Sequence, residues 1–382
     1  MGKIFLVRNS YHPNDAPTNR FLSFLEGFSQ LGVDVEAVFV LSDKRGSKVD
    51  KQWPHVHITY LWEQLNWKNR LLSFVSYEIL SRRFVKQLKE GDKVVLFDPQ
   101  RMLYRLLKKK GIKVFAERTE HPFVVQSRRL NTRNYLEACK KLDGLFVIST
   151  PLREYFISEG FSADKVHIVN MTVDASRFTG LKKQSTPYRY IAYCGTASNN
   201  KDGVDELIKA YSVVHKRHPD VYLYIIGKAL KEKDDSGNMQ LVKDLGLLDE
   251  VVFTGILPTT EMPQILKNAE IVALARPDSL QAQCGFPTKL GEYLLTENPV
   301  VITEVGDIPK FLEDGKTALL AELRDAQQFA EKIIWALEHP QEAAVIGKKG
   351  AEVAMREFNC ITETKKIVDV INDIGFVSAE QI

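Results

Sequence analysis

The chain has 382 residues, 44% of them hydrophobic and 26% charged, and its formal net charge is +3. This length exceeds what one ordinary hydrophobic core supports, so we expect two domains. No apolar run approaches the roughly 18 residues of a transmembrane helix, and the four cysteines show no CxxC spacing, which argues against a membrane span, a disulfide framework and a zinc site.

Short apolar runs alternate with helical patterns in the first part of the chain. Thr18, after Pro17, is the expected N-cap of the first helix, and Gly32 is its expected end. Because a strand–helix–strand unit joins parallel strands, this order predicts a parallel sheet. The expected strands are 3–9, 33–40, 92–98, 112–117, 145–150 and 165–170, and the expected helices are 18–32, 101–111, 132–144 and 151–160.

The alternation breaks at residues 171–189, a polar stretch without periodicity that we interpret as a linker. It then resumes and continues to about residue 340, which predicts a second doubly wound domain. The expected strands are 190–195, 221–227, 251–255, 270–275 and 298–303, and the expected helices include 203–219, 237–250, 259–269 and 324–340.

Several motifs of common ligand sites are absent. No GxGxxG follows a strand, and GxxxxGK(S/T), Asp-x-Asp, HExxH and GxSxG do not occur. The usual dinucleotide fingerprint and the P-loop are therefore missing, which counts against a two-domain nicotinamide oxidoreductase.

In open parallel sheets, ligands bind beyond the carboxyl ends of the strands, and three loops of the second domain are suited to this. The first contains Gly195, Lys201 and Gly203 before a helix, whose amides and positive charge favour a phosphate; the alternative is an ordinary strand–helix loop. In the second loop, Gly255 and Pro258 flank backbone groups that can frame a planar base.

The third loop, residues 284–301, has the sequence CGFPTKLGEYLLTENPVV. Gly285 permits a close backbone approach, and Thr288 offers a hydroxyl near the start of a helix. Lys289 and Glu292 are three residues apart and share a helix face, from which Glu292 can reach a vicinal diol such as ribose. The alternative is a Lys–Glu surface pair, which stabilises a helix by about 0.2 to 0.5 kcal/mol.

The order of these loops resembles the C-terminal half of family 4 retaining glycosyltransferases of the two-domain GT-B type. The resemblance covers about 150 residues, from YCGTASNNKDG through GFPTKLGEYLLTENPVV to DGKTALL. It extends backward to the family's Asn-x-x-Val-Asp-x-x-x-Phe linker, which here is Asn170, Val173, Asp174 and Phe178.

This resemblance implies an α/β GT-B fold, in which two Rossmann-like doubly wound domains face each other across a cleft. Residues 1–178 would form an acceptor-binding domain, with a C-terminal helix at 359–376 packing back on it. Residues 186–358 would bind a nucleotide-sugar donor.

The resemblance also implies roles for individual residues. The implied catalytic residues are Lys201 as a ligand of the donor diphosphate, Glu292 as the ribose carboxylate and His121 as the histidine that faces the transferred sugar. A capped loop histidine is the alternative for His121. Phe286 and Thr288 would place backbone amides against phosphate or sugar hydroxyls. The implied donor-binding set, which includes no metal ligand, is Gly195, Thr196, Lys201, Gly255, Ile256, Gly285, Phe286, Thr288, Lys289 and Glu292.

Two positions depart from the family pattern. The family commonly has an arginine five residues before the lysine, where this chain has Thr196, and a glutamate eight residues before the ribose carboxylate, where it has Cys284. We expect Lys289 to restore the missing charge and the main chain at Gly285 to replace the missing acid.

The implied function is retaining, metal-independent transfer of a sugar from a nucleoside-diphosphate donor to a saccharide or lipid-linked saccharide acceptor in cell-surface polysaccharide synthesis. The nucleotide sugar is a substrate, and no cofactor is expected. Two alternatives share the fold. A catalytically weak sugar-nucleotide binding protein would transfer nothing, and a nucleotide-sugar epimerase would need no acceptor.

Positive charge is concentrated in the first part of the chain. Residues 1–150 hold 26 Lys and Arg against 15 Asp and Glu, whereas residues 151–382 hold 26 against 34. The excess is either a solvated helix face or a surface for an anionic acceptor or acidic lipid. We expect a cytoplasmic protein that either stays in solution or contacts the inner face of the membrane peripherally. We expect no nucleic-acid partner. The candidate acceptor contacts are His12, Asn14, Asp15, Arg20, Asp98 and residues 128–133.

Overall fold

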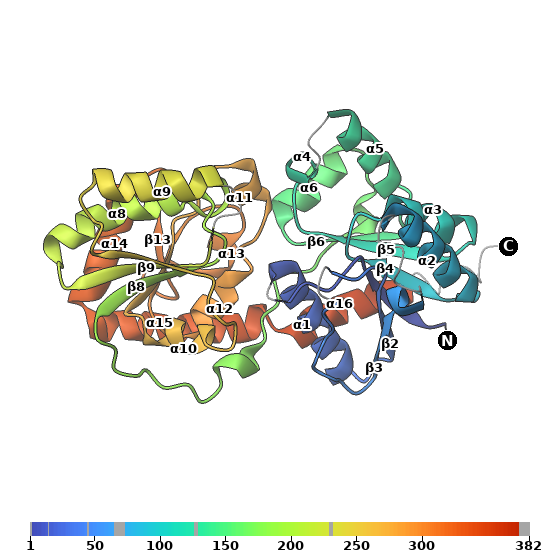
Figure 1. Ribbon diagram of the computed structural model, residues 1–382, viewed down its shortest axis with the longest axis horizontal. Helices are drawn as coiled ribbons and strands as arrows, with labels where there is room; N and C mark the ends of the chain where they lie inside the picture. The colour runs from blue at the N-terminus through green and yellow to red at the C-terminus, as the bar shows by residue number, and fades with distance from the viewer. Residues whose placement is uncertain are drawn as a thin grey trace. The chain divides into compact units, whose positions relative to one another are not determined.

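A computed structural model describes residues 2–13, 15–43, 46–64, 73–125, 129–228 and 232–373. The chain forms two compact units (Figure 1). The first unit runs to Thr172 and resumes at Cys360, and the second comprises Val173–Asn359.

The described part of the first unit contains a seven-stranded parallel sheet in the order β3-β2-β1-β4-β5-β6-β7. Its central strands are largely buried, as expected where helices cover both faces of a parallel sheet. The strands are β1 (Ile4–Arg8), β2 (Val35–Phe39), β3 (Val56–Tyr60), β4 (Lys93–Leu96), β5 (Lys113–Arg118), β6 (Gly144–Val147) and β7 (Val166–Ile168). The helices are α1 (Ala16–Gln30), α2 (Ser73–Gln87), α3 (Arg101–Lys109), α4 (Pro122–Val125), α5 (Arg129–Cys139), α6 (Thr150–Ser158) and α16 (Cys360–Asp373), with 3-10 turns at Leu61–Gln64 and Ala163–Lys165.

Helix α1 begins earlier than the sequence predicts. Its N-cap is Asp15, whose side chain accepts a hydrogen bond from the backbone N–H of Thr18, and Pro17 lies within its first turn. The prediction that Thr18 is the N-cap is therefore wrong. The Asp15 carboxylate accepts from a backbone N–H of the first turn, which has no partner within the helix, and this is the function of an N-cap. Proline is well tolerated in the first turn of a helix.

The C-terminal helix α16 lies beside α1, at the opposite end of the sequence (Figure 1). The two helices approach so closely that a Cβ on Gly27 would lie 2.1 Å from Thr364 Oγ1. Glu363 of α16 accepts a 2.6 Å hydrogen bond from the backbone N–H of Asn170. Helix α16 is therefore part of the first unit, to whose core it contributes the buried side chains of Ile367 and Ile371.

A buried ion pair ties α1 to the sheet. Arg20, which is 4% exposed, bonds Glu117 at 2.7 Å and donates to the carbonyl oxygens of Val169 and Asn170 at 2.9 and 2.7 Å. Its guanidinium also lies 4.8 Å from the ring centroid of Phe24. This arrangement corrects the expectation that Arg20 contacts an acceptor, because all of its donors face the protein interior.

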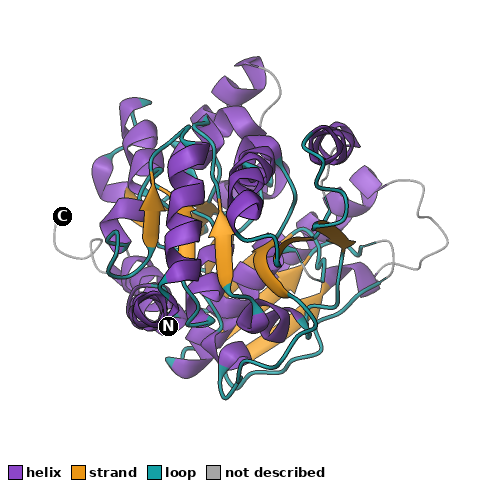
Figure 2. Cartoon of the chain, turned by 90° about the vertical axis from the view of Figure 1, so that its left-hand side faces the viewer, coloured by secondary structure: helices purple, strands orange, loops and turns teal. Residues whose placement is uncertain are grey.

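The described part of the second unit contains a six-stranded parallel sheet in the order β10-β9-β8-β11-β12-β13. Helices lie on both sides of these strands (Figure 2). The strands are β8 (Arg189–Cys194), β9 (Val221–Ile226), β10 (Val251–Gly255), β11 (Ile271–Leu274), β12 (Val300–Thr303) and β13 (Leu319–Ala321). The helices are α7 (Asn199–Asp202), α8 (Val204–Arg217), α9 (Glu232–Asp244), α10 (Met262–Asn268), α11 (Leu280–Cys284), α12 (Lys289–Leu295), α13 (Ile308–Phe311), α14 (Ala326–Glu338) and α15 (Pro340–Glu357), with a 3-10 turn at η4 (Ala175–Phe178).

The described ranges contain neither a membrane-spanning helix nor a cluster of metal ligands. No helix there combines the length and the apolar character needed to cross a bilayer. The same residues contain no group of three or more His, Cys, Asp or Glu side chains placed to hold a metal ion.

Replacing Arg20 with methionine should lower the free energy of unfolding by about 3 to 5 kcal/mol, because Glu117 is left buried without its partner. The double variant Arg20→Met/Glu117→Leu should recover part of this loss. Urea unfolding in a Trp335→Phe background isolates the first unit, since the other three tryptophans, Trp53, Trp62 and Trp67, precede residue 172. A loss below about 1 kcal/mol in the single variant would contradict the assignment.

Candidate functional site

Three glycines follow one another across the carboxyl ends of β8, β9 and β10. Gly195 has φ +153°, Gly227 has φ +122° and Gly255 has φ +68°, all outside the range that L side chains prefer. The N–H of Gly195 bonds Ile226 O, and the N–H of Gly227 bonds Gly255 O, each at 2.9 Å. The result is an edge built from main chain, which a flat or anionic ligand can approach closely.

The space around two of these glycines is filled. A Cβ on Gly195 would lie 2.2 Å from Lys289 Nζ, and a Cβ on Gly227 would lie 2.0 Å from the carbonyl oxygen of Gly195. A Cβ on Gly255 would meet nothing within 4 Å, and the side chain of the next residue, Ile256, is 77% exposed. The main chain at Gly255 and Ile256 is therefore open, as required for the predicted base contact, which stays a prediction.

Lys289 is held inside the unit by the end of the β8 loop. Its Nζ lies 2.5 Å from Asp202 Oδ2 and donates to the Tyr193 hydroxyl at 3.1 Å. It also lies 4.7 Å from the centroid of the Tyr193 ring. The Tyr193 hydroxyl in turn lies 2.6 Å from Thr196 O. The predicted Lys289 thus comes together with Gly195 and Thr196, but its ammonium is already bonded to a buried carboxylate.

Asp202 is the acid at the centre of this cluster. Burial alone would raise the pKa of its carboxyl, but the positive charges of Lys289 and Arg276 outweigh burial and lower it. Arg276 Nη1 lies 3.9 Å from Asp202 Oδ1. Gly203, with φ +63°, lets the chain pass directly over Ala275, because a Cβ there would lie 1.8 Å from Ala275 O.

Lys201 lies in α7, one residue before Asp202, and is half-buried. Its positive charge lowers the pKa of Asp202, and it also lowers that of Lys289, for which burial is the larger cause. The predicted phosphate ligands Lys201 and Lys289 therefore lie close enough to interact, at the same edge of the sheet as Gly195. The phosphate role of each stays a prediction.

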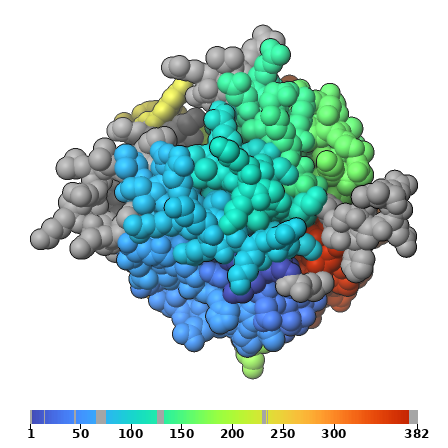
Figure 3. All heavy atoms as spheres, turned by 90° about the vertical axis from the view of Figure 1, so that its right-hand side faces the viewer, coloured from blue at the N-terminus to red at the C-terminus, as the bar shows by residue number. Residues whose placement is uncertain are grey.

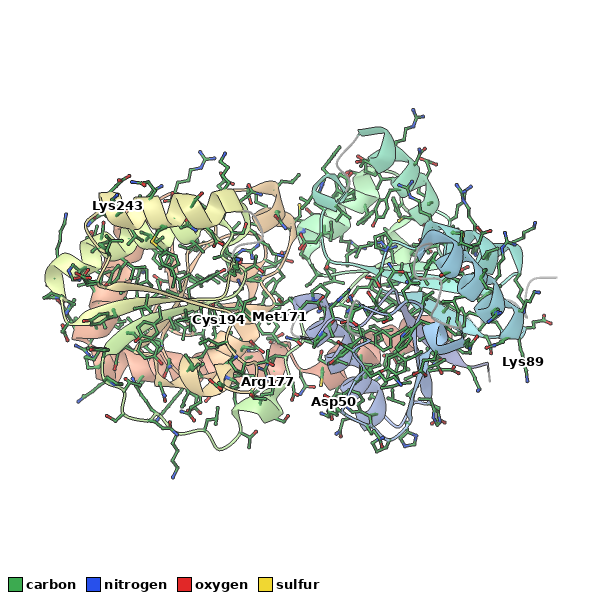
Figure 4. The ribbon with its side chains drawn as sticks, viewed as in Figure 1. Asp50, Lys89, Met171, Arg177, Cys194 and Lys243 are labelled. Carbon is green, nitrogen blue, oxygen red and sulfur yellow. The ribbon has the colours of Figure 1, made fainter. Side chains whose placement is uncertain are left out.

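Glu292 lies in the first turn of α12, and its Oε1 forms an ion pair with Arg177. Arg177 belongs to η4 and also donates to Thr259 O at 3.1 Å. Burial and the charge of Glu292 raise the pKa of Cys194 to about 12, which places that thiol near the same carboxylate. Arg177 and Cys194 are labelled in Figure 4. Lys289 and Glu292 therefore do not pair with each other, contrary to the surface-pair alternative.

The chain between α11 and α12 carries the remaining predicted contacts. Gly285 caps α11 with φ −89°, and Thr288 occupies the N-cap position of α12 without capping it through its side chain. The Phe286 ring packs against Phe311 and Phe358, with centroids 5.5 Å from each. Any ligand contact at Phe286 thus comes from its main chain. Cys284 is buried, which raises the pKa of its thiol, so it does not supply the acid found there in the family.

His121 belongs to the first unit, whereas the other predicted site residues belong to the second. The imidazole is 3% exposed and lies against Tyr155 and Phe123, with centroids 4.0 and 5.4 Å away. Burial lowers its pKa below the ordinary value of 6.5, so it is neutral at pH 7. Its Nδ1 accepts a hydrogen bond from the N–H of Phe123 at 3.2 Å, which leaves the proton on Nε2.

Other predicted acceptor contacts are engaged or lie outside the described residues. Asp98 pairs with Arg8 at 3.6 Å and accepts from the N–H of Asn9 at 2.7 Å. Asn14 and part of the run 128–133 lie outside the described residues.

Sequence reasoning missed four residues that organise the site. Tyr193, Asp202 and Arg276 surround Lys289, and Arg177 holds Glu292. Two sequence signals were available. Asp202 directly follows the predicted Lys201, and Arg276 directly follows the apolar strand EIVALA. Arg177 lies in the segment interpreted only as a linker.

Residues 188–339 match the family described as Glycosyl transferases group 1. Trehalose synthase of Pyrococcus horikoshii is 26% identical over 177 residues, which are 45% of this chain and 41% of that protein. Mannosylfructose-phosphate synthase of Agrobacterium fabrum is 23% identical over 260 residues, which are 64% of this chain and 53% of that protein. The matched part of this chain thus spans about half the length of these two relatives.

A solved structure of Anabaena HepE in complex with UDP-glucose superposes with a TM-score of 0.74 at 16% identity, covering 98% of this chain and all of that one (100%). The predicted fold class, α/β GT-B with two Rossmann-like domains, is confirmed. The domain at residues 188–339 belongs to the glycosyl transferases group 1, as the resemblance implied.

Adding a Cβ at Gly227 should destabilise the protein more than adding one at Gly246. Both have positive φ, but only Gly227 faces a backbone oxygen, at 2.0 Å, whereas Gly246 (φ +70°) has nothing within 4 Å. Gly246→Ala should cost about 1 to 2 kcal/mol, from the backbone conformation alone. Urea unfolding followed by far-UV circular dichroism measures both variants, and equal losses would contradict a packed main-chain edge.

Proposed function

We propose that this protein is a retaining, metal-independent glycosyltransferase that moves a sugar from a nucleoside-diphosphate donor to a saccharide or lipid-linked saccharide acceptor. The observation that carries the proposal is the main-chain edge of Gly195, Gly227 and Gly255 with Lys201 and Lys289 beside it. It lies within the segment that matches a glycosyltransferase family. HepE, which shares the fold, has been solved with UDP-glucose.

The chemistry that this edge supports is stabilisation of a leaving diphosphate. As the glycosidic bond breaks, negative charge grows on the phosphate oxygens, and fixed positive charge lowers the barrier most when it is already in place. Lys201 and Lys289 supply that charge from side chains of this unit. In the retaining route, the leaving phosphate oxygen takes the acceptor proton on the same face of the sugar, so no separate base and no cofactor is required.

Glu292 is proposed to bind the ribose hydroxyls of the donor. Its ion pair with Arg177, which is itself anchored to Thr259 O at 3.1 Å, fixes the direction of the carboxylate before the ligand arrives. His121 is proposed to donate a hydrogen bond from Nε2 to a hydroxyl of the transferred sugar. Because burial lowers the pKa of His121, its imidazole is neutral at pH 7 and can donate this hydrogen bond without attracting the diphosphate away from the lysines.

The acceptor is proposed to bind the first unit, and polysaccharide synthesis on the cytoplasmic side of the membrane is the proposed setting. The excess of 26 Lys and Arg over 15 Asp and Glu in residues 1–150 supports an anionic acceptor or membrane surface. Two other functions would use the same donor site. A binding protein would take up the nucleotide sugar without transfer, and an epimerase would convert it without an acceptor.

A thermal-shift titration with UDP, GDP, ADP and CMP, each with and without magnesium, tests the donor site. A bound ligand at about 100 times its dissociation constant should stabilise the protein by roughly 2.7 kcal/mol. One diphosphate should raise the melting temperature equally with and without magnesium. No shift with any nucleotide would contradict the proposal, and release of a sugar epimer from the donor would favour the epimerase.

Lys201→Ala and Lys289→Ala should each lower transfer by a similar factor, about 100-fold or more, because each removes a charge that stabilises the leaving group. Lys209→Ala is the matched control, since Lys209 lies on α8 in a surface pair with Glu206. Transfer is measured as nucleoside diphosphate released at saturating donor. Full activity in a folded Lys289 variant would show that Lys289 serves only to neutralise Asp202.

A further inference from the structure

A small cavity with a few polar side chains in its wall lies at the carboxyl ends of β4 and β5 in the first unit, next to the N-terminus of α3. Helix α3 belongs to the face of that unit seen in Figure 3. The cavity measures about 20 Å³. The cavity lies near the protein surface, since two of its lining residues are accessible to solvent: Pro99 is exposed and Arg101 is half-buried. The side chains of Gln100, Tyr104 and Arg118 are part of its lining.

Three of the lining side chains hold buried polar atoms without a hydrogen-bond partner in the protein. These atoms are both amide atoms of Gln100, the hydroxyl of Tyr104 and Nε of Arg118. The three residues are 3%, 7% and 9% exposed. Gln100 occupies the N-cap position of α3, yet its side chain does not cap the helix. A buried polar group without a hydrogen-bond partner destabilises the protein, so the convergence of several such groups on one cavity calls for a ligand.

The charge of Arg118 sets the sign of that ligand. Its Nη1 donates to the carbonyl oxygens of Leu96 and Glu117, which are neutral. Within the described residues, no carboxylate lies at ion-pair distance from Arg118. Asp98, the acid that acts on it through space, forms a 3.6 Å ion pair with Arg8 and accepts a hydrogen bond from the N–H of Asn9. A buried guanidinium without a counter-charge is unfavourable, and an anion supplies one.

The donors outnumber the acceptors around the cavity. Arg118 Nε–H and the Gln100 amide N–H₂ can only donate, and burial raises the pKa of Tyr104 to about 12, so its hydroxyl keeps its proton. The volume suits one oxygen atom rather than a whole phosphate, since a single water needs about 10 to 15 Å³. A carboxylate can place one oxygen inside and leave the rest of its molecule toward Pro99 and Arg101.

We propose that this cavity binds one carboxylate, with an oxygen held by Arg118 Nε–H, the Gln100 amide and the Tyr104 hydroxyl. Its source is either a free small carboxylate or an acidic sugar. The second source rests on the proposed function, because it would make the acceptor a uronic acid bound to the first unit. The first source does not depend on that function.

The probes are sodium formate, glucuronate and glucose, titrated in a thermal-shift assay at constant ionic strength, with methanesulfonate as the balancing anion. The variants are Gln100→Leu, Tyr104→Phe and Arg118→Gln. Tyr77→Phe is the matched control, because Tyr77 also has a buried hydroxyl without a partner but does not line the cavity. If Arg118→Gln does not fold, the other two variants decide.

Formate should stabilise the wild type saturably, and each cavity variant should lose about tenfold or more in formate affinity, as for removal of a hydrogen bond to a charged group. The Tyr77→Phe variant should bind formate like the wild type. Stabilisation by glucuronate but not glucose would assign the site to an acidic sugar, and stabilisation by formate alone would assign it to a free anion. A shift that is linear in salt, or equal in all variants, would mean a water-filled cavity and overturn the proposal. The nucleotide titration is independent of either result.

Discussion

The second unit depends on one buried carboxylate. Asp202 bonds Lys289 at 2.5 Å and faces Arg276 at 3.9 Å, so it joins the segment after β8 to the start of α12 and to the loop after β11. The parallel pairing of β8 with β11 already brings the segments after these strands to one edge of the sheet, and Asp202 then links them to α12. Removing one partner of such a pair typically costs about 3 to 5 kcal/mol, because the other charge stays buried.

The first unit is organised by a similar constraint. Arg20 reaches across to Glu117 and the carbonyl oxygens of Val169 and Asn170, and Glu363 of the C-terminal helix accepts from the N–H of Asn170. The segment Val169–Asn170 is thus bonded both by a residue near the N-terminus, Arg20, and by a residue of the C-terminal helix, Glu363. Lys93 adds a further tie, since its ammonium donates to Ile371 O at 2.8 Å. A unit built from two distant parts of the sequence needs such directional bonds, because apolar packing alone does not fix register.

The donor end of the proposed enzyme combines rigid main chain with charges that are already paired. Gly195 and Gly227 leave no room for a side chain, because Lys289 Nζ and the carbonyl oxygen of Gly195 fill that space. Lys289 and Glu292 are each held by a neighbour, Asp202 and Arg177 respectively. Their positions are therefore set before a ligand binds, and a nucleotide meets a site whose reorganisation is small. In the proposed function Lys289 has two tasks, because the charge that it would offer to a phosphate also neutralises Asp202.

The sequence alone determined the alternation of strands and helices, the parallel sheets, the GT-B fold and the loops at the carboxyl ends of β8, β10 and β11. The GT-B fold was implied by the family resemblance, whereas the other features depend on local periodicity and on turn residues such as Gly195 and Gly255, which act within a few positions of themselves. The sequence predicted the ends of helices less accurately. Helix α1 is capped by Asp15 rather than Thr18, and α9 begins at Glu232, ahead of the predicted helix 237–250. Only the tertiary structure decided which charges meet. Arg177 with Glu292 and Asp202 with Lys289 are separated by 115 and 87 residues, and no local pattern records a partner at that distance. The cavity at Arg118 was hidden for the same reason, since its three polar side chains come from the N-cap of α3, from α3 itself and from β5, and become neighbours only when the sheet forms.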